Sequence, residues 1–216
     1  MSVQCPPQVQ RMLGEATIRY AYREFQQAVR LLVEIVRLCP GLPHPYQTLG
    51  LMYEEMGEQK KAVALFMMAA HLSKHDPNQW RHIATLSLQL GDKQQAVYCY
   101  TRLLSKRSDD IEALWELSLL NIELGQLKKA TEGLEKLYQA QQRQRLSEAA
   151  RQDAEQISEM RRHQLRVLRL LAQQYLKLGQ LDKCAEVLSN ALERRGIRAG
   201  SMAPIQDESS LPPQPT

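Results

Sequence analysis

Small residues recur along this chain with a period of 34 residues. They are the alanines Ala28, Ala62, Ala96 and Ala130 and the glycines Gly57, Gly91 and Gly125. A fixed period of this length indicates a repeat architecture, in which each repeat is one supersecondary unit that cannot bury its apolar face alone. Neighbouring repeats must therefore stack, and the chain is expected to fold as a solenoid rather than around one central core.

The period and the helical character of each unit are those of the tetratricopeptide repeat (TPR). Alignment on the alanines gives repeats at residues 9–42, 43–76, 77–110 and 111–144. The second repeat fills every recognised TPR position except the closing proline. Small residues at the eighth and twentieth positions of a repeat let its two antiparallel helices approach closely, and large residues fill the surrounding space.

The recurring glycines stand where the chain must reverse between the two helices of a repeat. Glycine just past a helix end adopts the left-handed conformation without a Cβ clash. Gly57, Gly91 and Gly125 are therefore expected at turns. In the first repeat Arg23 takes that place, and we expect a looser or differently capped turn there.

Beyond the fourth repeat the period is interrupted. Residues 145–164 contain no glycine or proline, which favours a helical extension or spacer. Residues 165–198 read as a fifth TPR-like helix pair with Gly179 at its turn. We expect a flexible N-terminus at residues 1–8 and a disordered Pro- and Ser-rich tail at residues 199–216. The predicted fold is all-α: a right-handed superhelical TPR solenoid of about five helix pairs, with a long helical spacer before the last.

Cysteine usage and hydropathy point to the cell interior. The four cysteines show no CxxC spacing and are expected to be reduced thiols of a cytosolic or nuclear chain. No apolar run approaches the roughly 18 residues of a spanning helix, and the first residues lack the pattern of a secretion signal. We therefore expect a soluble intracellular protein without membrane contact.

No catalytic or cofactor-binding motif is present in the sequence. A Gly-rich phosphate loop, GxSxG, HExxH and paired-Cys zinc signatures are all missing. His71 and His75 have the spacing of two metal ligands on a helix, but Asp76–Pro77 should end that helix and no third ligand is near. A structural or surface role is favoured for both histidines. We expect no enzyme activity, cofactor, metal site or small-molecule substrate, and protein binding as the function.

The concave groove of a TPR solenoid is lined by the first helix of each repeat. In the expected register it mixes Leu, Ile and Trp with Glu. The groove residues are His44, Gln47, Leu51, Glu54, Glu55, Asn78, Arg81, Thr85, Leu88, Gln89, Glu112, Trp115, Leu119, Ile122 and Glu123. Trp115 follows the core position of Leu114, so it either points into the groove as a binding anchor or packs between neighbouring repeats.

The groove residues also restrict the kind of partner. TPR proteins that grip the C-terminal carboxylate of heat-shock chaperones need Lys and Asn at two positions of the first repeat, which here hold Leu13 and Thr17. A carboxylate clamp is therefore not expected. The mixture of apolar and acidic side chains suits an amphipathic or extended segment that carries apolar anchors and basic flanks.

A local excess of arginine stands out against the small net charge of +4. The residues are Arg161, Arg162, Arg166 and Arg169. On a helix they would form a basic patch that contacts phosphate or an acidic partner segment. The alternative is a solvated helix with internal ion pairs, such as Glu159 with Arg162. This alternative is favoured because lysines and interleaved aromatic residues are missing.

Several stretches go beyond the general TPR pattern. They are VEIVRLCP at 33–40, YQTLGLMYEEMG at 46–57, AAHL at 69–72, Trp80 with Ile83–Ala84, QAVYCYTR at 95–102 and Leu114–Trp115. In this combination the chain resembles the N-terminal TPR array of the TPR subunit of transcription factor TFIIIC, which serves RNA polymerase III. The Ala-Ala-His-Leu and Tyr-Cys-Tyr segments are the most telling, because TPR packing does not require them.

The resemblance covers roughly residues 10–140. It implies a nuclear scaffold subunit of TFIIIC that recruits TFIIIB to tRNA and 5S RNA genes. The implied partners are other TFIIIC subunits and TFIIIB components, with DNA contact secondary. Family members are much longer, so we expect a fragment or a shortened homologue. Two alternatives stay open: a generic TPR adaptor of another multiprotein complex, and a nucleic-acid module that contacts phosphate through the arginine-rich helix.

Overall fold

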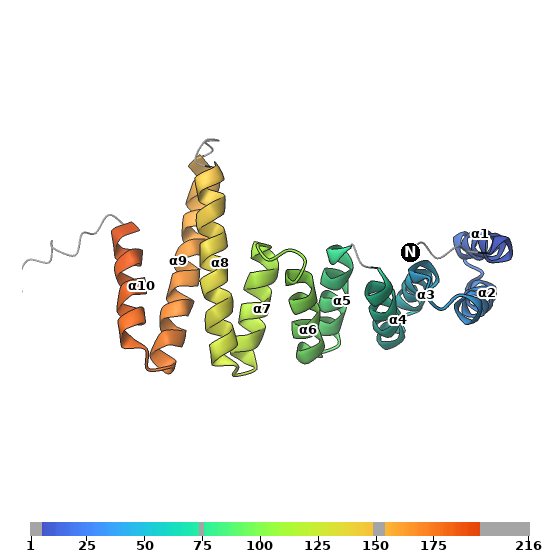
Figure 1. The fold of residues 1–216 in the computed structure, drawn as a ribbon, viewed down its shortest axis with the longest axis horizontal. Coiled ribbons are helices and arrows are strands. Elements are labelled where there is room, and N and C mark those ends of the chain that lie inside the picture. The colour runs from blue at the N-terminus through green and yellow to red at the C-terminus, as the bar shows by residue number, and fades with distance from the viewer. Residues whose placement is uncertain (1–5, 74–75, 149–153, 195–216) are drawn as a thin grey trace, which may run out of the picture. The chain divides into compact units, whose positions relative to one another are not determined.

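Every secondary-structure element in the described part of the chain is an α-helix, as predicted. The computed structural model describes residues 6–73, 76–148 and 154–194, and the chain divides into two compact units, residues 1–126 and 127–216. The first unit contains α1 (Pro7–Ala21), α2 (Phe25–Leu38), α3 (Pro43–Glu55), α4 (Gln59–Leu72), α5 (Pro77–Gln89), α6 (Lys93–Leu104) and α7 (Ile111–Glu123). The second contains α8 (Leu127–Glu148), α9 (Ala154–Lys177) and α10 (Leu181–Arg194), all labelled in Figure 1.

The helices α3, α5 and α7 begin at residues 43, 77 and 111, which are the first residues of the second, third and fourth expected repeats. Each start has a local cause. Pro43 and Pro77 occupy the first turns of α3 and α5, where the fixed φ of proline suits the helix and its missing N–H is not needed. Asp110 caps α7, because its carboxylate accepts a hydrogen bond from the N–H of Ala113 at 3.0 Å.

The turns inside the repeats share one left-handed residue. Gly57, Gly91 and Gly125 have φ values of 77°, 77° and 70°. Arg23 has a φ of 60° and takes the same conformation. The N–H of Arg23 donates to the carbonyl of Tyr20 and the N–H of Glu24 to that of Arg19, both at 2.9 Å. The expectation of a looser or differently capped turn at Arg23 is therefore wrong, because the same pair of hydrogen bonds closes the turn at Gly57. They do so although the left-handed conformation costs a residue with a Cβ about 1–2 kcal/mol.

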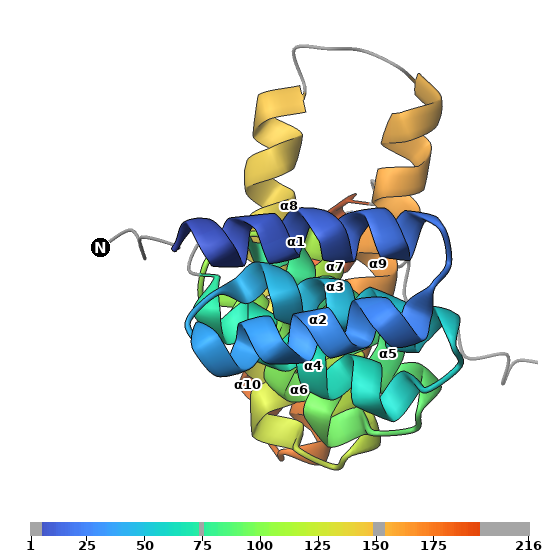
Figure 2. The ribbon, with the colours of Figure 1, turned by 90° about the vertical axis from the view of Figure 1, so that its right-hand side faces the viewer.

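The periodic alanines lie at the tightest points of the packing. Ala28, Ala62, Ala96 and Ala130 are each 0% exposed. In the first unit each helix packs against the next along the chain, from α1 on α2 to α6 on α7. Figure 2 looks directly onto α1 and α2, which lie side by side. This stacking of consecutive helix pairs is the solenoid packing that the repeat period predicted.

The second unit is built on its two longest helices. α8 and α9, of 22 and 24 residues, pack against each other (Figure 1), and α9 also packs against α10. Tyr175 on α9 donates a hydrogen bond to the Glu135 carboxylate on α8. Burial, followed by this hydrogen bond, raises the pKa of Tyr175 far above its usual value. The phenol therefore remains a donor that ties α9 to α8.

The structure describes only parts of the segments that were expected outside the four regular repeats. Both α8 and α9 extend into residues 145–164, whereas residues 149–153 and the tail expected at 199–216 lie outside the described part of the chain. Pro7 and Gln8 belong to α1, so these two residues of the expected flexible N-terminus are helical, because proline suits a first helical turn. Among the described helices, none combines the length and the apolar character that crossing a membrane requires.

Candidate protein-binding surface

The groove residues lie on the first helices of three consecutive repeats, α3, α5 and α7. None of them is buried. Those that are half-buried are Glu54, Arg81, Leu88, Trp115, Leu119 and Ile122, and the others are exposed. The first unit therefore presents these side chains at its surface, where a partner chain can reach them.

The apolar groove residues gather on α7. Trp115, Leu119 and Ile122 follow one another at helical spacing and are all half-buried. Leu114, the residue before Trp115, is 2% exposed. The face of α7 that carries Leu114 is therefore buried in the core, and Trp115 lies at the edge of that face. Partly exposed apolar side chains of this kind are typical anchors of protein interfaces, with tryptophan the most strongly enriched type.

The charged groove residues are mostly acidic, with four glutamates and one arginine. The glutamates make contacts across the repeats: Glu54 meets His82 at 3.3 Å, and Glu123 meets Lys93 at 3.0 Å. These pairs are exposed and contribute little to stability. Within the chain, the carboxylates of Glu54 and Glu123 therefore already have partners, and a preference of the groove for a basic partner stays a prediction.

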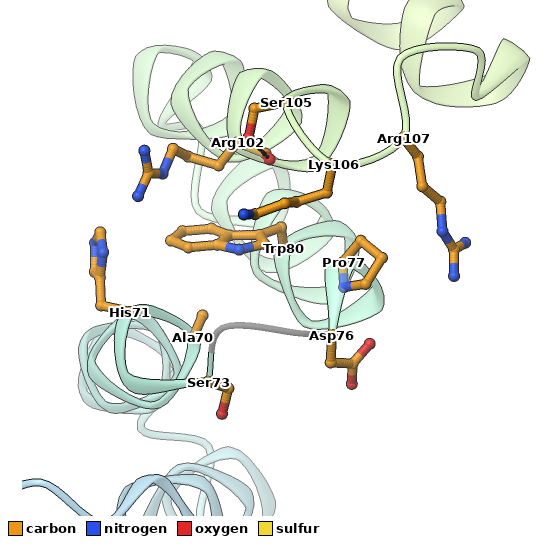
Figure 3. A pocket seen from close by; sticks show the side chains of 10 residues that line it. All are labelled: Ala70, His71, Ser73, Asp76, Pro77, Trp80, Arg102, Ser105, Lys106 and Arg107. Carbon is orange, nitrogen blue, oxygen red and sulfur yellow. Dashed lines mark hydrogen bonds between the residues drawn. The ribbon is translucent and has the colours of Figure 1, made fainter. Parts of the chain in front are cut away.

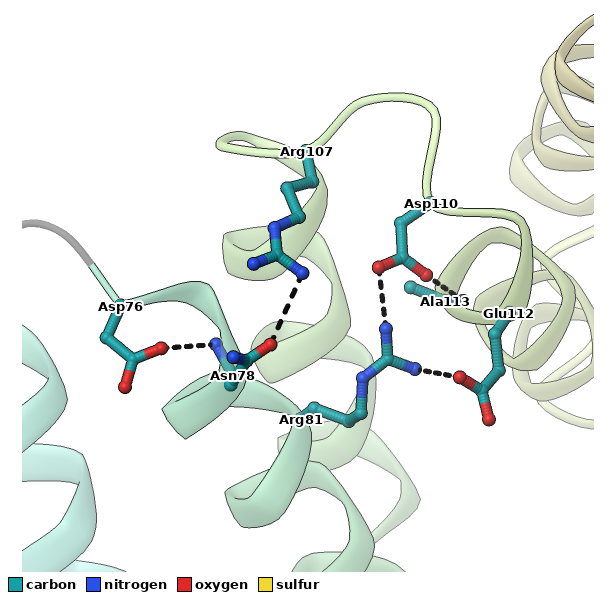
Figure 4. Close-up of polar contacts among 7 residues, drawn as sticks. All are labelled: Asp76, Asn78, Arg81, Arg107, Asp110, Glu112 and Ala113. Atoms are coloured by element: carbon teal, nitrogen blue, oxygen red, sulfur yellow. Dashed lines mark hydrogen bonds and ion pairs between the residues drawn. The ribbon is translucent and has the colours of Figure 1, made fainter. Parts of the chain in front are cut away.

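The arginine of the groove is held by two carboxylates (Figure 4). Arg81 on α5 donates to Asp110 and to Glu112 at 2.6 Å each, and so connects the third repeat to the start of the fourth. Nearby, Arg107 donates to the Asn78 side chain at 3.3 Å. Arg81 therefore acts first as a tie between repeats, a role that its groove position in the sequence did not indicate.

This hydrogen-bond network lowers the pKa of the Asp110 carboxyl. Burial alone would raise the pKa of Asp110, but the Ala113 N–H and the Arg81 guanidinium outweigh it, so the pKa is lowered from 3.8. A carboxyl with a depressed folded-state pKa contributes stability above its unfolded pKa, and this contribution is lost as the pH falls through the folded pKa. Asp110 therefore links the stability of the first unit to acid pH.

Asp110→Asn is expected to destabilise the first unit by about 1–2 kcal/mol at neutral pH, because the ion pair with Arg81 is lost while asparagine still caps α7. The difference from the wild type should be smaller at acid pH than at neutral pH, since the wild-type carboxylate is protonated as the pH falls through its lowered folded-state pKa. Urea unfolding at both pH values measures it, with the exposed neighbour Asp109→Asn as the control. A difference that does not change with pH would contradict this role.

A cavity of about 230 Å³ opens beside the groove between α3, α4 and α5. Gln47 and Asn78 line it together with residues that the sequence did not single out, among them Phe66, Gln79 and His82. The side-chain oxygen of Gln79 is buried and has no hydrogen-bond partner among the described residues, so it can accept a hydrogen bond from a ligand. Sequence reasoning missed this cavity because Phe66 comes from a second helix, while Gln79 and His82 lie on α5 outside the expected groove positions.

The predicted basic patch lies on α9 in the second unit. Arg161, Arg162, Arg166 and Arg169 are all exposed. Arg166 and Arg169 also line an apolar cavity of about 650 Å³ between α9 and α10, together with Leu176 and Leu188. The arginines thus border leucine side chains, and contact with phosphate stays a prediction.

Neither of the two candidate metal ligands takes part in a metal site that the structure describes. The His71 ring packs edge-on against Trp80, with ring centroids 5.1 Å apart, and His75 lies outside the described residues. In the described ranges, no group of three or more His, Cys, Asp or Glu side chains is placed to hold a metal ion.

The chain is similar in sequence to three transcription factor subunits. It is 32% identical over 132 residues to general transcription factor 3C polypeptide 3 of Homo sapiens, and 31% identical over 132 residues to the transcription factor tau 131 kDa subunit of Saccharomyces cerevisiae. It is 35% identical over 142 residues to the tau subunit sfc4 of Schizosaccharomyces pombe. The matches cover 61%, 61% and 62% of this chain but only 15%, 13% and 14% of the relatives. No protein-family profile matches the chain.

The chain resembles solved structures to different degrees. The structure of Naa15/Naa10 bound to HypK-THB matches 87% of this chain and 32% of its own, with a TM-score of 0.54 and 20% identity. YrrB, a TPR protein with an unusual peptide-binding site, matches 86% of this chain and 85% of its own, with a TM-score of 0.47 and 14% identity.

The sequence relatives are transcription factor subunits rather than enzymes. The chain is thus an all-α TPR protein that is homologous, over about three fifths of its length, to the TPR subunit of TFIIIC.

Proposed function

We propose that this chain is a nuclear scaffold subunit of TFIIIC that recruits TFIIIB for RNA polymerase III transcription of tRNA and 5S RNA genes. The sequence similarity to the human and yeast subunits supports the assignment to this machinery. The TPR fold supports a binding function, because stacked repeats present an extended surface to another polypeptide. Other TFIIIC subunits and TFIIIB components are the proposed partners.

The observation that carries this proposal is the surface of the groove. Its half-buried apolar side chains on α7, which include Trp115 and Leu119, lie on the same line of first helices as the glutamates. An amphipathic helix or an extended segment complements such a surface when it carries apolar anchors and basic flanks. The proposed ligand is therefore a basic, apolar-anchored segment of a TFIIIB component.

Trp115→Ala is expected to weaken binding of a TFIIIB component by about tenfold or more, because a large anchor in an interface commonly contributes that much. Its helicity and melting temperature should stay close to those of the wild type. The measurement is a binding titration of the purified chain, with circular dichroism on the same sample. Tyr22→Ala is the matched control, since Tyr22 is an aromatic residue that is 77% exposed and lies outside the groove.

Loss of the fold in Trp115→Ala would show that Trp115 packs between repeats, and unchanged binding would remove it from the interface. Partner identity is tested separately, by immunoprecipitation of the chain from nuclei followed by mass spectrometry. Recovery of TFIIIC and TFIIIB subunits is the expected result. Absence of all of them would refute the assignment to the polymerase III machinery.

A further inference from the structure

A second surface of the first unit, apart from the groove, is a cavity of about 650 Å³ between the end of α4, the start of α5 and the end of α6. Its lining includes His71, Asp76, Trp80, Arg102, Lys106 and Arg107, and none of the groove residues belongs to it. Figure 3 shows Arg102 and Lys106 beside the ring of Trp80, whereas Arg107 lies beyond Pro77 and points away from the ring. We name this site the basic cavity.

The basic cavity carries more positive charge than the residues around it balance. The lining holds Arg102, Lys106 and Arg107 against one carboxylate, that of Asp76, and Arg107 also interacts electrostatically with Asp110 outside the lining. Asp76 is already used as the cap of α5, accepting from the N–H of Asn78 at 2.9 Å. Among the described residues, none of the three cations makes an ion pair. A carboxylate of another molecule would supply the missing countercharge.

An aromatic cluster fixes the position of one of these cations. The Arg102 guanidinium lies 5.7 Å from the centroid of the Trp80 ring and 6.0 Å from that of Tyr98. Trp80 is itself only 5% exposed and packs edge-on against Tyr98 and His71. A guanidinium held on a ring face in this way keeps its N–H groups for a planar carboxylate.

The segments that meet at the cavity are those that TPR packing leaves unexplained. The Ala-Ala-His-Leu stretch contributes Ala70 and His71, and the stretch that contains Tyr-Cys-Tyr ends in Arg102. Basic residues at the end of a helix also complement its dipole. That effect accounts for a cation in the last turn of α6, but it does not require cations to converge with an aromatic floor on one cavity.

We infer that the basic cavity binds an acidic segment of a protein partner, with a Glu or Asp side chain seated over Trp80 between Arg102 and Lys106. Arginine and lysine bind carboxylates through charge-assisted hydrogen bonds, which are about twice as strong as neutral ones. The inference does not depend on the groove, because the two surfaces share no residue and favour opposite charges. It assigns to the first unit a second binding site.

A peptide fits these observations better than a nucleic acid does. Contact with duplex DNA requires cations spread along an extended surface, so that each meets a successive phosphate. Here Arg102 on α6 and Lys106 in the loop after it converge on one concave site, whose volume is in the range of pockets for small ligands. A carboxylate side chain on a flexible segment can enter such a site.

The test is the binding of a short fluorescein-labelled peptide rich in Glu and Asp to the full chain, followed by fluorescence anisotropy. The cavity variant replaces Arg102, Lys106 and Arg107 with glutamine. The control variant replaces Lys128, Lys129 and Lys136 with glutamine, which changes the net charge equally at exposed positions on α8. We expect the cavity variant to bind the peptide at least about tenfold more weakly than the wild type, and the control variant to bind nearly as the wild type does.

Several outcomes would overturn the inference. Equal weakening in the cavity and control variants would show that net charge alone attracts the peptide, and so would equal binding of a peptide with Gln and Asn in place of the acids. Tighter binding of duplex DNA that is lost in the cavity variant would identify a nucleic-acid site instead. If the cavity variant fails to fold, Lys106→Glu with Arg107→Glu tests the same site and leaves Arg102 on Trp80. Trp115→Ala should still bind the acidic peptide, which separates this test from that of the groove.

Discussion

Trp80→Ala is expected to lower the free energy of unfolding of the first unit by about 3–5 kcal/mol, the usual cost of removing a large buried aromatic side chain. Trp80 belongs to the core cluster that joins α4, α5 and α6. It also supports His71, Tyr98 and Arg102 on its ring. The substitution therefore leaves a void where the second and third repeats meet and removes the floor of the basic cavity.

Urea unfolding followed by far-ultraviolet circular dichroism measures this loss. Tyr98→Ala is the matched control, because Tyr98 contacts the same cluster but is 41% exposed. Tyr98→Ala should lower the free energy of unfolding much less than Trp80→Ala does, since folding buries little of the surface of the Tyr98 side chain. An unfolding midpoint for Trp80→Ala that equals that of the control would show that the cluster does not hold the two repeats together.

Gly50→Val is expected to destabilise the second repeat by about 1–3 kcal/mol through overpacking. A Cβ atom at Gly50 would lie 2.6 Å from Cδ1 and Cε1 of Phe66 and 3.0 Å from Cζ. Phe66 is 6% exposed and packed in the core, so its ring cannot move away without disturbing its neighbours. This contact sets the distance between α3 and α4.

The same unfolding experiment on Gly14→Val provides the control, because a Cβ at Gly14 has no atom within 4 Å. That change should stay within about 0.5 kcal/mol of the wild type. Combining Gly50→Val with Phe66→Leu should cost less than the sum of the two single changes, since the smaller side chain leaves room for valine. Additive costs would contradict a clash between these two positions.

The fold could be predicted from the sequence because one constraint repeats along the chain. Wherever two helices cross closely, only a small residue fits, and the spacing of Ala28, Ala62 and Ala96 records those crossings. Helix starts were also predictable, because Pro43 and Pro77 favour a first helical turn on their own. Each of these signals depends on a residue and its near neighbours in sequence.

The features that escaped prediction depend on residues far apart in sequence. Arg23 was expected in a looser or differently capped turn, yet it adopts the left-handed geometry that glycine adopts elsewhere, in a turn that connects the packed helices α1 and α2. The pairing of Arg81 with Glu112 joins the third repeat to the fourth, and Trp80 on α5 meets Arg102 on the following helix, α6. A list of groove positions could include Arg81 but could not show that its charge is already neutralised.

The packing of each helix in the first unit on its chain neighbours also decides how that unit comes apart and reassembles. Contacts between residues close in sequence can form early, so a topology of this kind favours rapid folding. The free energy of unfolding is then close to the sum of the intrinsic stabilities of the single repeats and of the interfaces between neighbouring repeats. Within the first unit the pair of α1 and α2 packs on α3 alone, whereas α4 and α5 each have a helix on both sides. Amide hydrogens of α1 and α2 should therefore exchange with solvent sooner than those of α4 and α5.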